Sequence, residues 1–385
     1  MIARTRPGQR PPAPRTDRTR VLLLIKGLGR GGAEQLVVNS VACGDASRFE
    51  YHVAYLLPWK DAFVGDLRRL DVPVDCLDGA KGLGWVARLG RLVRARDIQI
   101  VHVHSPYVAA MVRGAALGRG RPRLVTTEHN VWDRYHRATY WANAITFPRN
   151  DHVFAVSREV EESVRFPVPL RSLRKPPMET LHHGVDVAAI LATPPANGIR
   201  EELGLPESAT VVGTVANFKE HKGHHHLLRV AERVVKQRSD VRFVLVGGGP
   251  RQEEIQRDAR ERGLGDAVVF TGFRPDAHRI MRTFDIYFLA STHEGLPLSL
   301  LEAMVLGCPV VATDVGGVSA AVVDGGNGYV VAATDADLQA ERIVDLIDDP
   351  GLRARFAEAA HTSAAGLDVR NAVRRIEDVY AGLVT

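Results

Sequence analysis

The chain has 385 residues, of which 45% are hydrophobic and 25% are charged. These fractions are those of a globular protein and exclude a disordered, collagen-like or mucin-like chain, while the length suits two domains. Three widely spaced cysteines exclude a disulfide framework and a cysteine-based zinc site. The few, scattered cysteines indicate a reducing compartment, so we expect a cytoplasmic protein. The first twenty residues lack the apolar core of a signal peptide, and the longest apolar run near the start, 21–25, is far too short to span a bilayer.

The net charge of +5 is unevenly distributed along the chain. Residues 1–20 carry +5, residues 21–185 carry +7 and residues 186–385 carry −7. This asymmetry predicts two domains with different partners. The basic half either faces an anionic partner, such as a membrane on the inner side of the cell or an acidic acceptor, or it is a solvated surface without such a partner. We expect no nucleic-acid partner.

The first half of the chain has the pattern of a parallel sheet covered by helices. Residues 1–20, rich in proline and arginine, are predicted to form a disordered basic tail. After them, short apolar runs alternate with amphipathic stretches, which is typical of buried parallel strands connected by helices. We expect strands at 21–25, 51–57, 98–103, 123–127 and 152–156, and helices near 33–43, 84–96 and 107–117.

The segment 166–180 interrupts this pattern, because it contains four prolines and no periodicity, and we predict a linker there. The pattern then restarts. We expect strands at 210–216, 242–246, 268–271, 285–289 and 309–312, and helices at 223–237, 251–263, 297–306, 337–348, 352–364 and 369–382. The prediction is two Rossmann-like, doubly wound domains, 21–180 and 181–366, with a ligand at the carboxyl ends of their strands and a final segment 367–385.

A glycine-rich turn follows the first predicted strand. Gly27, Gly29 and Gly32 match the G-x-G-x-x-G spacing of dinucleotide sites. Such a site also needs an acid at the end of the second strand, and residues 56–60 (LLPWK) contain none. An NAD-dependent oxidoreductase is therefore a weak alternative. The turn still suits a phosphate or sugar close to the backbone, or it is only a tight turn that needs glycine.

Two glutamates flank a second predicted helix start. Glu294 precedes Pro297, whose fixed φ suits the beginning of a helix, and Glu302 lies in the second turn. The free N–H groups of Leu298 and Ser299 would point toward a bound diphosphate. The two carboxylates would accept hydrogen bonds from a sugar and from a ribose diol, and neither needs a metal for this.

The segment from Glu294 to Glu302 resembles the E-x7-E signature of glycosyltransferase family 4, a family of retaining glycosyltransferases with the GT-B fold. Five other segments, in the order found in the family, resemble its glycine turn, active-site histidine segment, phosphate loop, Gly-Pro turn and base-contacting segment. They are Gly31–Glu34, Thr127–Asn130, Ala216–Gly223, Val246–Pro250 and Phe270–Phe273. The resemblance implies that the first domain binds an acceptor, that the second binds a nucleotide-diphosphate sugar, and that residues 367–385 form a helix that crosses back to the first domain.

The resemblance also implies residue roles. The catalytic residues would be Glu294 on the transferred sugar, His129 near that sugar and Lys222 on the diphosphate. The donor-binding residues would be Gly31, Gly32, Asn217, Lys219, Gly248, Gly272, Phe273, Gly295, Leu296, Pro297, Leu298, Ser299 and Glu302. No cofactor and no metal are implied, because the nucleotide sugar is itself a substrate.

Three positions depart from the family pattern. Asn217 stands where the family commonly has an arginine, and we expect Lys219 to supply the missing positive charge. His183 stands where an asparagine is usual before Gly-Val-Asp, and Ala320 replaces a glutamate. These departures leave open an unusual donor or a degraded enzyme.

Two weaker patterns have open interpretations. The helix predicted at 84–96 is basic and amphipathic, so it either lies on an anionic membrane or buries its apolar side in the sheet. His102 and His104 alternate along a strand, where they either pack in the core or lie near the cleft. The histidines at 221, 224, 225 and 226 are not expected to bind a metal, because neighbouring helical residues point in different directions.

The resulting functional prediction is a retaining, metal-independent glycosyltransferase. It would move a sugar from a nucleotide-diphosphate sugar, with UDP as the favoured nucleotide, to a hydroxyl acceptor that is lipid-linked in many similar enzymes. Its pathway would be the biosynthesis of a glycan, glycolipid or glycoconjugate. A non-catalytic nucleotide-sugar-binding protein of the same fold is the alternative.

Overall fold

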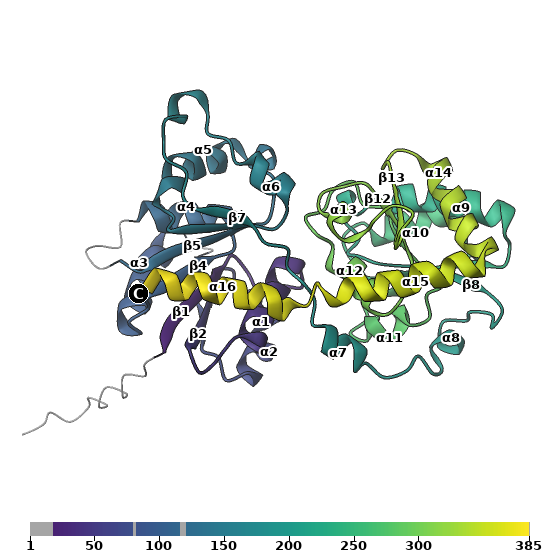
Figure 1. Cartoon of the computed structure of the whole chain (residues 1–385), viewed down its shortest axis with the longest axis horizontal. Coiled ribbons are helices and arrows are strands. Elements are labelled where there is room, and N and C mark those ends of the chain that lie inside the picture. Colours follow the sequence, from purple (N-terminus) through teal and green to yellow (C-terminus); the bar gives the residue numbers. More distant parts are fainter. Residues whose placement is uncertain (1–17, 80–81, 116–120, 385) are drawn as a thin grey trace, which may run out of the picture.

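The apolar runs of the sequence form two parallel sheets, one in each of two lobes that lie side by side (Figure 1). The computed structural model describes residues 18–79, 82–115 and 121–384. Residues 1–17 of the predicted tail therefore lie outside the described residues. The rest of that prediction is wrong, because Thr19 and Arg20 belong to the first strand, where Arg20 forms an ion pair with Asp97 at 2.7 Å.

The first lobe, in its described residues, holds a seven-stranded sheet of order β3-β2-β1-β4-β5-β6-β7. Its strands are β1 (Thr19–Ile25), β2 (Phe49–Tyr55), β3 (Val74–Cys76), β4 (Ile100–Val103), β5 (Arg123–Glu128), β6 (His152–Ala155) and β7 (Met178–Thr180). Its helices are α1 (Gly32–Cys43), α2 (Val64–Arg69), α3 (Gly84–Ala95), α4 (Pro106–Gly114), α5 (Arg137–Thr146) and α6 (Arg158–Ser163), with short 3-10 turns η1 (Trp132–Arg134), η2 (Phe147–Arg149) and η3 (Val168–Leu170).

The second lobe holds a six-stranded sheet of order β10-β9-β8-β11-β12-β13. Its strands are β8 (Thr210–Val215), β9 (Val241–Val246), β10 (Val268–Gly272), β11 (Ile286–Leu289), β12 (Val310–Thr313) and β13 (Gly328–Val331). Its helices are α7 (Val187–Leu191), α8 (Ile199–Glu202), α9 (His224–Gln237), α10 (Gln252–Glu261), α11 (Ala277–Met281), α12 (Leu298–Val305), α13 (Val318–Ala321), α14 (Ala336–Asp348) and α15 (Pro350–Ala365), and η4 (Glu220–Lys222) is a 3-10 turn.

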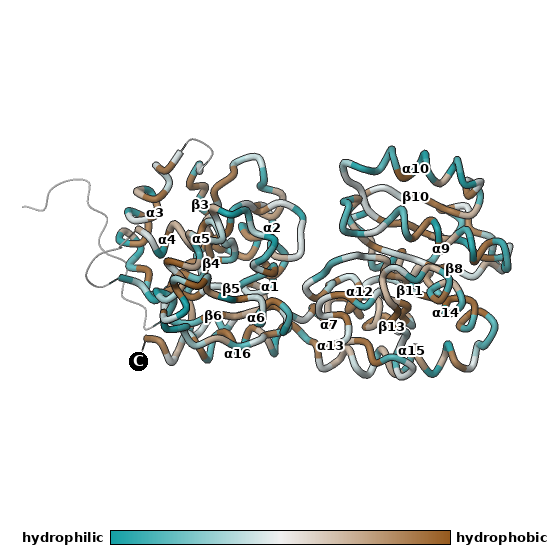
Figure 2. The backbone as a smooth tube through the Cα atoms, turned by 90° about the horizontal axis from the view of Figure 1, so that it is seen from above, coloured by the Kyte–Doolittle hydropathy of each residue, from teal (hydrophilic) through white to brown (hydrophobic). Residues whose placement is uncertain are grey.

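Both faces of each sheet are buried, which explains why the strands read as continuous apolar runs. Along β1, Val21 and Leu23 belong to one hydrophobic cluster while Leu22 and Leu24 belong to the cluster on the opposite face. Figure 2 shows brown apolar segments along the strands of both lobes and teal hydrophilic segments over outer helices such as α10. The predicted parallel doubly wound architecture is confirmed.

Three strands were not predicted, and one of them corrects the predicted linker. Met178–Thr180 forms β7, which pairs in parallel with β6, and the N–H of Val153 donates to the carbonyl of Pro177 at 2.9 Å. The first sheet therefore extends to Thr180. A strand of three residues that follows two prolines is too short to show an alternating pattern in the sequence. Its extended conformation is recognised as a strand only because it is hydrogen-bonded to β6.

The chain crosses between the lobes twice, at residues 181–185 and again at 366–369, and the two crossings are hydrogen-bonded to each other. The N–H of Val185 donates to Leu367 at 3.0 Å, and the N–H of Val369 donates to Val185 at 2.9 Å. A Cβ on Gly184 would lie 1.8 Å from the Leu367 carbonyl, so only glycine fits there. After the second crossing, α16 (Val369–Val384) packs on the first lobe, where Tyr380 joins its core (Figure 1).

The basic helix α3 buries its apolar side in the first lobe. Trp85, Leu89 and Val93 belong to the core cluster, and Arg88 donates to the carbonyl oxygens of Leu77 and Asp78 at 2.7 Å. Of the two interpretations of this helix, the structure supports packing on the sheet. Among the described residues, no helix combines the length and the apolar character needed to cross a membrane.

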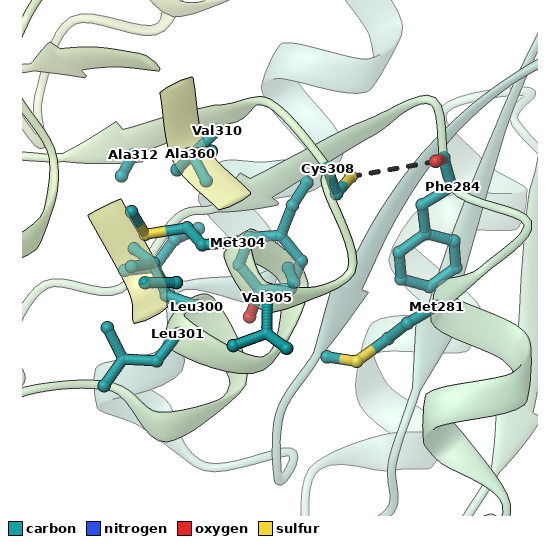
Figure 3. Packing of buried hydrophobic residues seen from close by; sticks show 14 of the residues in the cluster. Met281, Phe284, Leu300, Leu301, Met304, Val305, Cys308, Val310, Ala312 and Ala360 are labelled. Carbon is teal, nitrogen blue, oxygen red and sulfur yellow. Dashed lines mark hydrogen bonds between the residues drawn. The ribbon is translucent and has the colours of Figure 1, made fainter. Parts of the chain in front are cut away.

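The helix α12 is anchored by an apolar cluster in the second lobe. Leu300, Met304 and Val305 pack against neighbours that include Met281 and Ala360, as Figure 3 shows. The packing fixes the direction of α12, and with it the position of its first turn.

Candidate functional site

A cavity of about 560 Å³ lies between the two lobes. Each sheet has a point where the strand order reverses, between β1 and β4 in the first lobe and between β8 and β11 in the second. The loops that follow β1 and β5 in the first lobe, and β8 and β11 in the second, line the cavity from both sides. A crevice outside the carboxyl ends of parallel strands, at such a reversal, is where ligands bind in doubly wound folds.

Lys222 and Glu294 form an ion pair inside this cavity. Lys222 ends the turn η4 that follows β8, and Glu294 lies in the loop after β11. The Lys222 Nζ lies 2.6 Å from Glu294 Oε1, and the buried hydroxyl of Ser291 donates to the same oxygen at 2.6 Å. Glu294 is only 9% exposed, so two donors satisfy a carboxylate that is largely removed from water.

The Lys222 loop and the Glu294 loop are packed directly against each other. Gly223 has a φ of +67°, and a Cβ there would lie 1.9 Å from the Ala290 carbonyl at the end of β11. The N–H of Thr292 donates to the carbonyl of His221 at 2.8 Å. The glycine of the Lys222-Gly223 pair is therefore needed to bring the lysine to the glutamate.

The first turn of α12 presents free backbone N–H groups to the cavity. Pro297 has extended backbone geometry before the helix begins at Leu298. The Ser299 hydroxyl lies 2.7 Å from the hydroxyl of Tyr287, so this side chain already has a partner and the backbone N–H groups remain for a ligand. The cavity wall includes both Leu298 and Ser299, as expected of a site for an anion.

Glu302 lies one turn further along α12, beside a histidine from α11. The Nε2 of His278 lies 3.5 Å from Glu302 Oε2, and the hydrogen bond to this carboxylate raises the pKa of His278. Both side chains line the cavity. Glu294 and Glu302 thus lie on either side of the helix start.

The first lobe contributes a row of neutral imidazoles. The His129 Nε2 lies 3.3 Å from the His104 Nδ1, and the rings of His129 and His183 are nearly parallel with centroids 6.2 Å apart. Burial, together with the neighbouring imidazoles, lowers the pKa of His129 and of His183 to about 3. Near neutral pH these rings therefore exchange hydrogen bonds with hydroxyl groups and carry no positive charge.

The row continues into the core beneath the cleft. His102 stacks on His104 with ring centroids 4.3 Å apart, and its Nε2 lies 2.7 Å from the Thr127 hydroxyl. Its Nδ1 contacts the hydroxyl of Tyr380 on α16. The alternatives for the strand histidines are thereby resolved as packing, since both are buried, while His104 also supports the cleft residue His129.

The structure brings most of the predicted site residues to this cavity. Those that line it are Gly31, Gly32, His129, Asn217, Lys222, Phe273, Glu294, Gly295, Leu296, Pro297, Leu298, Ser299 and Glu302. The described lining does not include Lys219, Gly248 or Gly272. Lys219 is exposed before η4, three residues ahead of Lys222, and its charge acts on Glu34, which follows the glycine turn of the first lobe.

The glycine turns bring the lobes close together. A Cβ on Gly32 would lie 4.0 Å from the Leu298 side chain, and a Cβ on Gly295 would lie 3.1 Å from a methyl group of Val156. In the second lobe, Gly316 has a φ of +54° and leaves room for the Glu294 carbonyl. Glycines on both sides of the cleft therefore allow the two lobes, and the loops around Glu294, to approach closely.

Sequence reasoning missed several residues of the cavity wall, among them Arg30, Arg274 and His278. Arg30 carried a signal, because it is the basic residue inside the glycine-rich turn. Arg274 and His278 carried none, since they come from a loop and a short helix without a motif. Arg274 is paired with Asp276 at 2.8 Å.

The histidine-rich start of α9 has separate partners for its side chains. His224 stacks on Phe218, His225 lies 2.6 Å from Asp258, and His226 lies 2.7 Å from Gln339. These three imidazoles thus diverge, as expected of consecutive helical residues.

Two family models match the chain, and they meet near the crossing between the lobes. The model described as "Glycosyltransferase Family 4" matches residues 18–189. The model described as "Glycosyl transferases group 1" matches residues 196–363. The chain belongs to glycosyltransferase family 4. It is therefore a glycosyltransferase of the type that depends on a nucleotide sugar.

Curated relatives carry glycosyltransferase names. The chain is 27% identical to the putative glycosyltransferase EpsF of Bacillus subtilis, over 78% of this chain and 80% of that protein. It is 34% identical to a D-inositol 3-phosphate glycosyltransferase of Corynebacterium urealyticum, over 48% of this chain and 46% of that protein. It is 23% identical to the UDP-Gal:alpha-D-GlcNAc-diphosphoundecaprenol alpha-1,3-galactosyltransferase of Escherichia coli, over 85% of this chain and 87% of that protein.

Solved structures show the same fold. HepE of Anabaena in complex with UDP-glucose superposes with a TM-score of 0.82 at 22% identity, over 95% of this chain and all of that one. A glycosyltransferase from Rickettsia africae gives a TM-score of 0.80 at 15% identity, over 96% of this chain and 99% of that one. The two parallel sheets around a cleft are thus the GT-B fold, as predicted.

Proposed function

We propose that this glycosyltransferase transfers a sugar from a nucleotide-diphosphate sugar, with UDP favoured, to an acceptor hydroxyl, with retention of configuration and without a metal. The observation that carries the proposal is the Lys222–Glu294 ion pair of 2.6 Å beside the first turn of α12, with Glu302 one turn beyond. The arrangement offers one group for each part of such a donor. UDP is favoured because the Anabaena neighbour binds UDP-glucose and the Escherichia coli relative is named for a UDP-sugar.

The diphosphate would lie against the N–H groups of Leu298 and Ser299. Their partial positive charge and the ammonium of Lys222 would stabilise the negative charge that develops as the diphosphate departs. An ammonium has three N–H donors, so Lys222 can keep its bond to Glu294 while it contacts a phosphate oxygen.

The nucleoside and the sugar would lie on opposite sides of this anion site. Glu302 would accept hydrogen bonds from the ribose hydroxyls, and the base would pass beside Phe273. Glu294 would accept from a hydroxyl of the transferred sugar, and His129 would lie on its other side as an uncharged hydrogen-bonding partner.

Retention would follow if the acceptor hydroxyl attacks the anomeric carbon from the face that the diphosphate leaves. The bond from the anomeric carbon to the phosphate oxygen breaks, the bond to the acceptor oxygen forms, and a donor phosphate oxygen takes the acceptor proton. Glu294 need not act as a nucleophile in this step, and Lys222 and Ser291, which both donate to its Oε1, would hold the carboxylate in place as a hydrogen-bond acceptor for the sugar. No enzyme-bound intermediate is then required.

The acceptor would bind on the first lobe and would be lipid-linked, in the biosynthesis of a glycan or glycolipid. The Escherichia coli relative, whose printed name includes a diphosphoundecaprenol substrate, supports this. Contact with an anionic membrane at its cytoplasmic face would then be electrostatic, through exposed arginines such as Arg91 and Arg94, because the apolar side of α3 is buried. Binding to vesicles containing phosphatidylglycerol should therefore be lost at high salt, and binding that persists at 1 M salt would contradict this contact.

A thermal-shift panel tests the donor class. The purified protein is heated with UDP, GDP, ADP, TDP or NAD, with and without EDTA. A ligand that binds only the folded state raises the melting temperature. We expect one nucleoside diphosphate to stabilise the protein equally with EDTA, Glu302→Ala to abolish the shift, and Glu358→Ala, which removes an exposed acid of α15, to leave it unchanged.

Two further outcomes separate the alternatives. A shift with NAD alone would indicate an oxidoreductase and refute the proposal. Turnover is measured as release of the nucleoside diphosphate from its sugar, and Glu294→Ala should lose it while still binding the nucleotide. A protein that binds the nucleotide sugar but transfers the sugar neither to an acceptor nor to water would be a sensor. The anomeric configuration of the first product, read by NMR, tests retention directly.

A further inference from the structure

Arg30 lies at the mouth of the cleft and stacks on an aromatic ring from the opposite lobe. Its guanidinium carbon is 4.4 Å from the centre of the Phe273 ring. Arg30 belongs to the glycine turn after β1, while Phe273 directly follows β10, so this contact joins the two lobes. Both residues line the cavity, and Phe273 is 54% exposed.

The charges of the cavity wall single out Arg30. Lys222 is paired with Glu294, and Arg274 is held by Asp276 and Glu202. Within the described parts of the chain, Arg30 is the arginine or lysine of this wall that has no acidic partner within ion-pair distance. A dianionic diphosphate entering this cavity would therefore find one uncommitted cation.

The turn that carries Arg30 also reaches the start of α12. Two residues after Arg30, a Cβ on Gly32 would lie 4.0 Å from the side chain of Leu298, whose N–H group belongs to the anion site. A guanidinium can stack with its face on a ring while the N–H groups at its edge stay free for phosphate oxygens. Stacking on Phe273 thus leaves the hydrogen-bonding edge available.

We propose that Arg30 is a donor-binding residue supplied by the first lobe, which contacts the terminal phosphate of the nucleoside diphosphate while it stacks on Phe273. The proposal rests on the proposed function and adds a residue that it did not assign. Arg30 would add a positive charge from the first lobe to the charge that Lys222 supplies from the second lobe. Donor binding would thereby hold the two lobes together at the mouth of the cleft.

The test compares binding of a nucleoside diphosphate with binding of its monophosphate. Calorimetry measures the Kd of whichever of UDP, GDP, ADP or TDP the wild type binds most tightly, and of the corresponding monophosphate. Arg30→Gln keeps a polar, flexible side chain but removes the charge and the guanidinium, and we expect it to weaken diphosphate binding about tenfold, as for a lost hydrogen bond to a charged group. The monophosphate Kd should change less than twofold, because the contacted phosphate is missing.

Two variants provide controls. Arg30→Lys keeps the charge and should retain tighter diphosphate binding than Arg30→Gln. Arg48 stacks on Phe49 at 5.1 Å on the same lobe but does not line the cavity, so Arg48→Gln removes an equivalent surface pair and should leave both Kd values unchanged. The melting temperature of each variant without ligand shows that it is folded.

The outcomes distinguish the two proposals. If Arg30→Gln binds the diphosphate as tightly as the wild type, or if it weakens diphosphate and monophosphate equally, the role of Arg30 is refuted while the proposed function stands. If the wild type binds none of the four nucleoside diphosphates, both proposals are refuted.

Discussion

Replacing Lys222 with methionine should destabilise the second lobe. Lys222 lies 2.6 Å from Glu294, and their side chains are 20% and 9% exposed. Breaking a buried ion pair from one side typically costs about 3–5 kcal/mol, because the other charge is left without a partner. Here Ser291 still donates to Glu294 and the lysine is partly exposed, so we expect a loss of about 2 kcal/mol of unfolding free energy.

Removing the charge of Glu294 as well should recover most of the lost unfolding free energy. In Lys222→Met with Glu294→Gln, no charge stays buried, so this double variant should be more stable than Lys222→Met alone by about 1 kcal/mol or more, although it should have no activity. Lys236→Met is the matched control. Lys236 pairs with Glu232 at 2.8 Å on the surface of α9, where such a pair contributes about 0.3–0.5 kcal/mol.

Urea unfolding followed by far-UV circular dichroism measures these differences. All four tryptophans lie before residue 142, so their fluorescence reports on the first lobe and provides an internal reference. A Lys222→Met variant as stable as Lys236→Met would refute the reasoning. So would a double variant that is less stable than Lys222→Met.

Three other predictions follow from the same structure. Burial lowers the pKa of His129 to about 3, so its imidazole should stay neutral near pH 6.5. The plot of kcat/KM against pH should therefore show no inflection near pH 6.5 that is due to His129. An inflection there that disappears in His129→Asn would contradict a neutral imidazole. Gly223→Ala should lower the free energy of unfolding by about 3 kcal/mol, because φ is positive and a carbonyl occupies the Cβ position. Gly263→Ala, where φ is also positive but the space is open, should lower it by about 1 kcal/mol. Equal losses in urea unfolding would refute the steric argument. Glu302 raises the pKa of His278 in the folded state, so the stability from this pair is fully present below the ordinary pKa near 6.5 and is lost as the pH rises through the raised value. His278→Gln should therefore lower the free energy of unfolding more at pH 6 than at pH 9. A loss that is independent of pH would show that the pair is not ionic.

The sequence was sufficient for the alternation of strands and helices. A run such as VLLLI at 21–25 is apolar at every position because both faces of its sheet are covered, and no helix pattern competes with it. The strands β3, β7 and β13 were not predicted, because they are edge strands that are only partly buried and so need no continuous run of large apolar residues. Their backbone groups become strands only through hydrogen bonds to β2, β6 and β12.

Part of the candidate site was equally readable. Glu294, Pro297 and Glu302 lie within one loop and the helix after it, so their spacing along the chain fixes their relation to the helix start. Lys222 next to Gly223 was readable for the same reason, since a turn before a helix places both. These are local relations, and local sequence determines them.

The tertiary structure alone decided which charges share the cavity. Lys219 and Lys222 are three residues apart in the sequence, yet the turn η4 directs only Lys222 to Glu294 and leaves Lys219 outside the cavity wall. Arg30 and Phe273 are 243 positions apart, and His278 meets Glu302 from a separate helix. Such pairings depend on how two sheets and two lobes pack, and no spacing within one segment encodes that packing.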